Sequence, residues 1–260
     1  MKKNLLILIL TVIYQFTFSQ QASSQLDIDH IIIWTKKDAP DTSIFQQKGF
    51  TIDNRKMTHT GFGTGGRYIF FYNVYLELLY INDDSEFNNR YKNIMSASRN
   101  DWKKNNDCPF GLGLSITPYD STQIPFPTKS LQAAWMKPNS SIFIDSSNYT
   151  YNHEPMVIIV PPYMVHPKFE TKEDIEKLSN ATIRNRYLVS AEHANGIKRL
   201  TNLKIFCDTS NFSSTISALK SLRDCKILKS KKNLMEMTFD NNIQEKTIDF
   251  RPALPIIIKY

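Results

Sequence analysis

GFGTGGRYIFFYNVYLELLYI, residues 61–81, is the stretch that decides the fold of this 260-residue chain. It opens with a G-x-G-x-x-G motif, which in dinucleotide-binding proteins stands between a strand and a helix, because the N-terminus of that helix binds the pyrophosphate. Here the polar run RKMTHT (55–60) precedes the glycines, and the Tyr-, Phe- and Ile-rich run 67–81 follows them, which predicts strands. The motif therefore predicts a glycine turn before a strand pair, with Gly63 and Gly65 in a tight conformation that alanine cannot enter, and no dinucleotide site.

The elements expected around this stretch form a β-α-β-β-β unit. LDIDHIIIW (26–34) predicts a strand, and SIFQQKGF (43–50) predicts a short helix that ends near Gly49. FTID, RYIFFY and VYLELLYI supply three more strands. Because one such curved sheet cannot cover both of its faces, we expect two units to pair around a cleft.

The rest of the chain repeats this order less clearly. A helical stretch at 85–104 is followed by GLGLSITP, SLQAAWMKP and PMVIIVPP, which predict three strands, and KFETKEDIEKLSN (168–180) is either a charged linker or a surface helix. From LTNLKIFCD (200–208) onward, the sequence again predicts a strand, a helix and further strands in that order. The sequence leaves open which later unit pairs with the first.

The expected fold is therefore α+β, with paired βαβββ modules that form curved mixed sheets around a cleft and a further βαβββ-like unit. We expect four segments along the chain. They are a first module at 26–82, a helix plus degenerate second module at 83–166, a linker at 167–192 and a C-terminal βαβββ-like module at 193–260.

The first 20 residues, MKKNLLILILTVIYQFTFSQ, have the pattern of a secretory signal peptide. Two lysines precede an apolar run, and Thr17 and Ser19 suit the positions before a cleavage site ahead of Gln20. The alternative is an uncleaved anchor, but the run is shorter than the roughly 20 residues of a membrane span. We expect residues 1–19 to be removed, the mature protein to be secreted or periplasmic, and no stable membrane span to remain.

The net charge bears on the class of partner, and the cysteines bear on metal binding and disulfide formation. Loss of Lys2 and Lys3 with the leader lowers the net charge from +7 to +5, and the remaining charge is dispersed, so we expect no nucleic-acid partner. The three cysteines lack a metal-binding spacing. Either Cys207 and Cys225 pair and leave Cys108 free, or all three are buried thiols.

Four segments together, LDIDHIIIW, KGF, GFGTGGR and YLELLYI, resemble the glyoxalase-like branch of the vicinal oxygen chelate (VOC) superfamily. In that branch an Asp-His strand, a Gly-Phe after the helix, a G-x-G-T-x-x-R turn and a Tyr-Leu-Glu-Leu strand recur. EPMVIIVPPYMVHP (154–167) and HANGIKRLTNLKIF (193–206) are similar to the same branch, so the resemblance runs from about residue 26 to the end.

The resemblance implies a cleft in which a divalent metal ion binds the adjacent oxygens of a small substrate. His30 and Glu77 match the metal-ligand positions, and imidazole with carboxylate suits Zn, Mn, Fe or Ni. It implies a lyase, isomerase or dioxygenase with Glu77 as the catalytic residue. The partner positions offer no further ligand in GLGLSI and only Asn202 in LTNLKIF. The alternatives are a metal-free module that binds a small molecule without catalysis, and an extracellular interaction protein with a degenerate cleft.

Further candidate residues concern the ligand. Arg67 and Arg251 either bind an anionic ligand or form structural ion pairs with Glu77 or Asp249. His193 and Asn195 match the His-x-Asn-Gly turn of the branch, which either contacts substrate or packs between units. The expected partner is a small-molecule ligand, bound by a monomer or homodimer.

Strand alternation predicts how the site is built. It places His30 and Ile32 on one face of the first strand, and Tyr75, Glu77 and Leu79 on one face of the strand at 74–81. His59, in a polar loop, is expected to be exposed.

Overall fold

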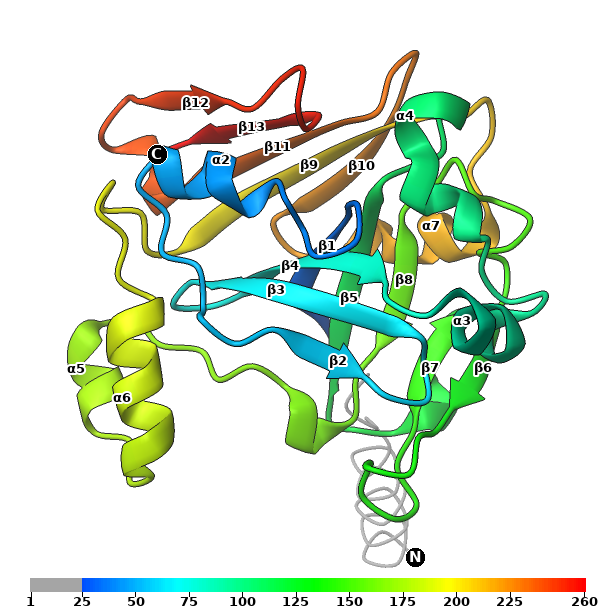
Figure 1. Cartoon of the computed structure of the whole chain (residues 1–260), viewed down its shortest axis with the longest axis horizontal. Coiled ribbons are helices and arrows are strands. Elements are labelled where there is room, and N and C mark those ends of the chain that lie inside the picture. The colour runs from blue at the N-terminus through cyan, green and yellow to red at the C-terminus, as the bar shows by residue number, and fades with distance from the viewer. Residues whose placement is uncertain (1–24) are drawn as a thin grey trace, which may run out of the picture.

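The computed structural model describes residues 25–260, so the predicted leader lies outside the described residues. Figure 1 shows an α+β protein built from two curved mixed β-sheets with short helices around them. The predicted fold class is confirmed. Within residues 25–260, every helix falls short of the length and apolar character needed to span a bilayer.

The larger sheet has eight strands in the order β2-β3-β4-β1-β5-β8-β7-β6. The strands are β1 (Gln25–Trp34), β2 (Met57–His59), β3 (Thr64–Phe70), β4 (Tyr75–Ile81), β5 (Phe110–Thr117), β6 (Thr128–Leu131), β7 (Ile142–Asp145) and β8 (Met156–Ile159). Each half repeats one topology, because β1 lies parallel to β4 and β5 lies parallel to β8, and in both halves the other two strands continue antiparallel toward the edge.

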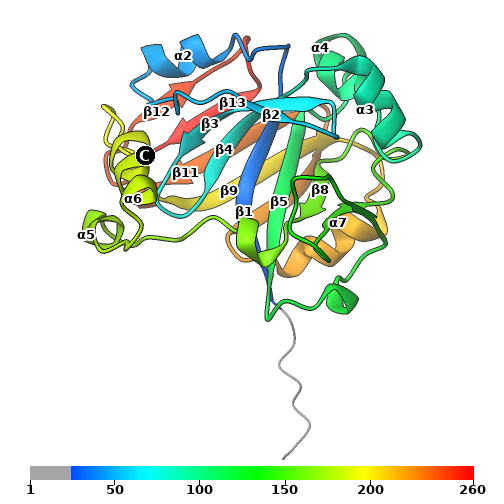
Figure 2. The same ribbon diagram turned by 60° about the horizontal axis from the view of Figure 1, so that its bottom comes forward.

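The first and second modules therefore pair, which answers the question that the sequence left open. Their junction is the antiparallel pair β1 and β5, which lie side by side at the centre of the sheet in Figure 2. The two modules differ in the segment after their first strand: where the first has helix α2 (Thr42–Gln47), the second has a 3₁₀ turn at Ser121–Gln123.

The C-terminal region forms a separate five-stranded sheet in the order β10-β9-β11-β13-β12. Its strands are β9 (Leu200–Asp208), β10 (Cys225–Ser230), β11 (Leu234–Phe239), β12 (Thr247–Asp249) and β13 (Ile256–Lys259). The expected order of elements along the chain is present, but the pairing differs from that of the first module. Here β9 lies between β10 and β11, whereas β1 pairs directly with the last strand of its own unit.

A large apolar core joins the two sheets. It includes Ile31 and Leu76 from the larger sheet and Ile205 and Met237 from the smaller one, all almost fully buried. The side chains of alternate residues on β1 and β4 leave this core and face the opposite side of the larger sheet, where a second apolar cluster forms around Ile32 and Leu79. The cavity described below lies on that second side.

Short helices cover the ends and edges of the sheets. They are α2, α3 (Asp84–Tyr91), α4 (Trp102–Asn105), α5 (Lys172–Glu176), α6 (Ala181–Ser190) and α7 (Ser214–Ala218). Three of them begin at a residue whose side chain accepts a hydrogen bond from a backbone N–H of the first turn: Asp83 for α3, Asn180 for α6 and Ser213 for α7.

Several local expectations need correction. The strand before the glycine turn is Met57–His59 and not FTID, because the polar run pairs with β3 through main-chain hydrogen bonds that side-chain polarity does not reveal. Most of SLQAAWMKP is loop, and IFID (142–145) forms the strand instead. Of the two alternatives for 168–180, the structure has the helix, α5, and the predicted linker 167–192 also carries α6.

The glycine turn docks on helix α3. The backbone N–H groups of Gly61 and Gly63 donate to the carboxylate of Glu86, at 2.6 and 2.8 Å. Gly63 has φ = +65°, and a Cβ there would lie 2.2 Å from the backbone nitrogen of Phe87, so only glycine fits. Gly65, by contrast, does not have a positive φ.

Candidate functional site

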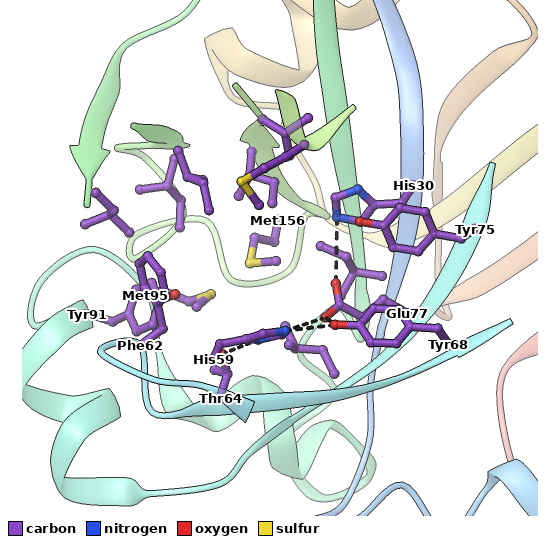
Figure 3. A pocket seen from close by; sticks show the side chains of 18 of the residues that line it. His30, His59, Phe62, Thr64, Tyr68, Tyr75, Glu77, Tyr91, Met95 and Met156 are labelled. Atoms are coloured by element: carbon purple, nitrogen blue, oxygen red, sulfur yellow. Dashed lines mark hydrogen bonds and ion pairs between the residues drawn. The ribbon is translucent and has the colours of Figure 1, made fainter. Parts of the chain in front are cut away.

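A cavity of about 140 Å³ lies between the two paired modules (Figure 3). Its polar end consists of side chains from the first module, and its other walls are mostly apolar or aromatic. These side chains come largely from both modules' strands and from α3: Ile32, Phe62, Leu79, Tyr91, Leu131, Ile144, Met156 and Ile158. The half-exposed ring of Trp135 also lines the cavity, and its Nε1–H donates to the carbonyl of Thr60.

A β-bulge positions the first polar residue. The register between β1 and β5 shifts between Ile28 and His30, which leaves Asp29 as the extra residue on β1. His30 and Ile32 then point toward the cavity, while Ile28 and Ile31 point into the core between the sheets. The alternation predicted for His30 and Ile32 agrees with this arrangement.

The bulge also brings Asp29 beside the His30 ring. The Oδ2 atom of Asp29 lies 2.7 Å from Nδ1 of His30, and both side chains are almost fully buried. The Oδ1 atom accepts the backbone N–H of His166 at 2.6 Å. Both carboxylate oxygens are therefore satisfied, and Asp29 holds the His30 ring with Nδ1–H toward it and Nε2 toward the cavity.

Glu77 enters the same cavity from β4. Its Oε2 atom lies 3.7 Å from Nε2 of His30, and its Oε1 atom lies 3.6 Å from Nε2 of His59 and accepts a hydrogen bond from Tyr68 Oη at 3.2 Å. Only 8% of the Glu77 side chain is exposed. This buried carboxylate thus lies between two imidazoles, without a lysine or arginine ion pair among the described residues.

The hydrogen bonds at Glu77 run in one consistent direction. Burial, together with the nearby Glu77 charge, raises the pKa of Tyr68 well above its usual value, so the phenol keeps its proton and donates it to Glu77. Tyr68 Oη in turn accepts from Nε2 of His59 at 2.8 Å, and Nδ1 of His59 accepts from the hydroxyl of Thr64 at 2.9 Å. This chain fixes Oε1 and leaves Oε2 facing the 3.7 Å gap to His30, which is too long for a direct hydrogen bond.

The second module contributes no polar side chain at the matching positions. On β5, Gly113 lies opposite His30, and a Cβ there would stand 1.9 Å from the ring. On β8, Met156, Ile158 and the following Val160 line the cavity. The cluster of His30, His59, Tyr68 and Glu77 therefore comes from the first module, and the segment 83–166 adds the phenol of Tyr91 and the indole of Trp135 to the wall.

The expected metal ion fits this donor set only in part. His30 backed by a buried carboxylate has the support that metal-ligating histidines usually have. A resident catalytic metal, however, typically takes three protein ligands. Among residues 25–260, no three His, Cys, Asp or Glu side chains form a group able to hold a metal ion. His30 and His59 lie 3.7 and 3.6 Å from the two oxygens of Glu77, and the reaction proposed below is written for these side chains.

The other candidate residues lie outside the cavity. Arg67 is on the opposite face of β3 from Tyr68 and donates to the carbonyl of Asp53, so it does not pair with Glu77. Arg251 forms an exposed ion pair with Asp249, which lowers the pKa of that carboxyl to about 2.

His193 and Asn195 connect the first module to the C-terminal unit. His193 accepts the backbone N–H of Thr51 at Nδ1 and donates to the carbonyl of Phe70 through Nε2, both at 3.0 Å. The side chain of Asn195 donates to the carbonyl of Lys48. Of the two roles left open by the sequence, these contacts match packing between units.

Sequence reasoning missed Asp29, His59 and Tyr68 as members of the polar cluster. His59 was expected to be exposed, yet its side chain is 22% exposed and is held by Tyr68 and Thr64. A signal for Tyr68 was present, because it is directly opposite Glu77 in the antiparallel pair β3–β4.

Comparisons with known proteins add little about the site. No family model matches the chain, and no curated protein matches it. A crystal structure of a hypothetical protein from Staphylococcus aureus is similar over 90% of this chain and 98% of its own, with 13% sequence identity and a TM-score of 0.49.

Proposed function

We propose that this chain is an exported glyoxalase-like protein of the VOC type that binds a small neutral carbonyl compound between its paired modules and exchanges a proton with it through Glu77. One observation carries the proposal. Within residues 25–260, the buried carboxylate of Glu77 has no lysine or arginine ion pair, and it faces a largely apolar cavity with one oxygen fixed by Tyr68 and the other 3.7 Å from His30.

The size and polarity of the cavity indicate the ligand class. A cavity of about 140 Å³ compares with the engineered apolar cavity of roughly 150 Å³ that holds benzene. The walls favour a compact apolar body, and the Glu77 carboxylate disfavours an anion. Nε2 of His30 and Oε2 of Glu77 both face the polar end as acceptors, so a ligand hydroxyl there would donate to one of them, and a hydroxyketone offers that group beside its carbonyl.

The proposed reaction is proton transfer at the carbon next to a carbonyl. The Oε2 atom of Glu77 takes the proton, and the electron pair of the broken C–H bond moves onto the carbonyl oxygen to give an enolate. Glu77 then returns the proton to the same carbon and the electron pair moves back from the oxygen, so no net oxidation occurs. Burial keeps water away from the carboxylate. Asp29 holds the His30 ring in place, and Tyr68 holds the Glu77 carboxylate.

A second candidate, binding without catalysis, is favoured by the closed hydrogen-bond chain from Thr64 to Glu77. That chain already satisfies Oε1, so the carboxylate can serve as a plain acceptor for a ligand hydroxyl.

Proton exchange in D₂O separates the two candidates. The mature protein is incubated with a panel of small ketones and hydroxyketones, and the loss of α-proton signals is followed by NMR. The proposal expects exchange with at least one compound, and Glu77→Gln should lower its rate by at least a hundredfold while ligand-observed NMR still detects binding. Arg67→Gln, on the opposite face of β3, is the matched control and should exchange at the normal rate. Binding that is equally strong in both proteins, with no exchange in either, would favour the second candidate.

A further inference from the structure

A second, wider pocket adjoins the inner cavity on the side of helix α6. Its volume is about 480 Å³, and it shares the walls formed by Tyr68, Tyr75 and Met164 with the inner cavity. The rest of this outer pocket comes from β3, from the segments 55–57 and 163–167, and from α6, which approaches the end of β3 in Figure 1. Nothing in the proposed reaction uses it.

Arg186, on α6, is the unusual residue of the outer pocket. Its guanidinium lies over the rings of Phe70 and Tyr187, at 5.3 and 4.8 Å from their centroids. Its Nε–H is buried and has no hydrogen-bond partner in the part of the chain that the structure describes. Within residues 25–260, none of the ion pairs includes Arg186. A half-buried cation with a spare donor is costly unless an anion compensates it.

The second arginine of the pocket does not need such a partner. Arg55 forms a two-point ion pair with Asp53 at 2.8 and 3.2 Å, so its charge is already balanced. The nearby His166 is buried against Phe71 and Tyr187, and burial lowers its pKa to about 4, which leaves it neutral near pH 7. The net charge of the outer pocket therefore comes from Arg186.

The remaining walls are aromatic. The rings of Tyr68 and Phe70 are stacked, the other contacts among Tyr68, Phe70, Tyr75 and Tyr187 are edge to face or tilted, and the exposed ring of Tyr163 lies at the same pocket. Flat apolar surfaces around one cation match a ligand with a planar ring and a single negative group. We propose that the outer pocket binds an aromatic carboxylate, with the carboxylate on Arg186 and the ring against the tyrosine and phenylalanine walls.

Charge separates this site from the inner cavity. Glu77 repels an anion from the inner cavity, whereas Arg186 attracts one to the outer pocket. The two sites are expected to select ligands of different charge, and the outer one does not depend on whether the inner one is catalytic.

Benzoate is the probe, and its binding is measured by ligand-observed NMR and calorimetry. We expect binding to the wild-type chain at millimolar concentrations or below, with Arg186→Gln weakening it at least tenfold, as the loss of a charge-assisted hydrogen bond implies. Arg186→Lys keeps the positive charge but not the planar guanidinium, so its affinity for benzoate should fall less than that of Arg186→Gln. This variant also tests the proposal if the glutamine variant does not fold. Arg223→Gln removes the same charge at an exposed position in the C-terminal region and should bind normally.

Two further measurements can overturn the proposal. Inorganic phosphate tests charge without a ring, and phosphate binding as strong as benzoate binding would remove the aromatic ligand class. Glu77→Gln should leave benzoate binding unchanged within about twofold. Tighter binding in that variant would place benzoate in the inner cavity instead, and no binding of benzoate at all, or equal binding by wild type and both Arg186 variants, would end the assignment.

Discussion

The imidazole of His30 lies directly against Gly113 across the junction of the two modules, and a Cβ built on Gly113 would stand 1.9 Å from Cε1 of that ring. Because Gly113 has no side chain, the second module leaves room for the imidazole that the first module contributes. Because the ring also stacks on Tyr75, at 4.5 Å between centroids, and is held by Asp29, it has little freedom to move aside. The position of His30 therefore depends on a glycine of the other module.

Gly113→Ala should displace His30 and destabilise the protein by about 1–3 kcal/mol, the usual cost of an overpacked core. Proton exchange should fall with it, since the gap to Glu77 changes. Urea unfolding and the D₂O assay measure the two effects. Gly111→Ala is the matched control, because its nearest neighbours are 3.2 Å away, and it should cost less. Equal losses in both variants would contradict the special role of Gly113.

Gly63→Ala should be the most harmful alanine substitution in the glycine turn. The added methyl would meet backbone atoms of Phe87 and Asp83 at 2.2 and 2.7 Å, and φ is +65°, so strain of about 1 kcal/mol adds to a clash that no side-chain movement relieves. Gly61→Ala has a comparable φ but meets only the Ala133 side chain, at 3.3 Å, and should cost less. Thermal melts of the two variants that shift equally would be evidence against this account.

All three cysteines are free and buried in the structure, so the native protein should resist thiol reagents. Burial raises the pKa of Cys225 to about 12, which keeps the reactive thiolate rare. Of the two alternatives left by the sequence, the structure shows the buried thiols. Mass spectrometry after maleimide treatment should find no label on native protein and three labels after unfolding in urea. Fewer than three labels without a reductant would reveal a disulfide.

The face of Glu77 could be predicted from sequence because a single carboxylate stands in a strongly apolar strand, where alternation fixes its direction. The same rule, applied across the β3–β4 pair, would have placed Tyr68 beside Glu77 and Arg67 on the other face. Asp29 could not be found in this way, because a bulge depends on the register with β5, which is 80 residues away along the chain. His59 was missed because a three-residue polar strand has no hydrophobic pattern.

The sequence could not decide which later unit pairs with the first module, because this too depends on contacts between distant strands. Both later units contain plausible first strands, and the choice depends on which one forms main-chain hydrogen bonds with β1. The glycines of β5 favour close approach to β1, which becomes clear only once His30 is seen over Gly113.

Two buried histidines should make the stability fall in mild acid. Burial lowers the pKa of both His166 and His193 from about 6.5 to about 4. Above pH 6.5 both are neutral in the folded and unfolded states and contribute no pH dependence. As the pH falls from 6.5 to 4, both histidines become protonated in the unfolded chain but stay neutral in the folded protein. The free energy of unfolding therefore drops by about 1.4 kcal/mol per pH unit for each histidine. Below pH 4 this contribution levels off.

Urea unfolding at pH 7.5, 6.5, 5.5 and 5.0 tests the pH dependence. The free energy of unfolding should be flat between 7.5 and 7, then decline, and His166→Gln should lower stability at pH 7.5 but roughly halve the slope below 6.5. Carboxyls with lowered pKa values, such as Asp249 at about 2, lose their contribution only as the pH falls below the ordinary carboxyl pKa of about 4, so they cannot produce a slope in this window. His153→Gln is the control, because that ring is half exposed and its loss should leave the slope unchanged. A slope that persists in full in a His166→Gln, His193→Asn double variant would show that other groups cause it.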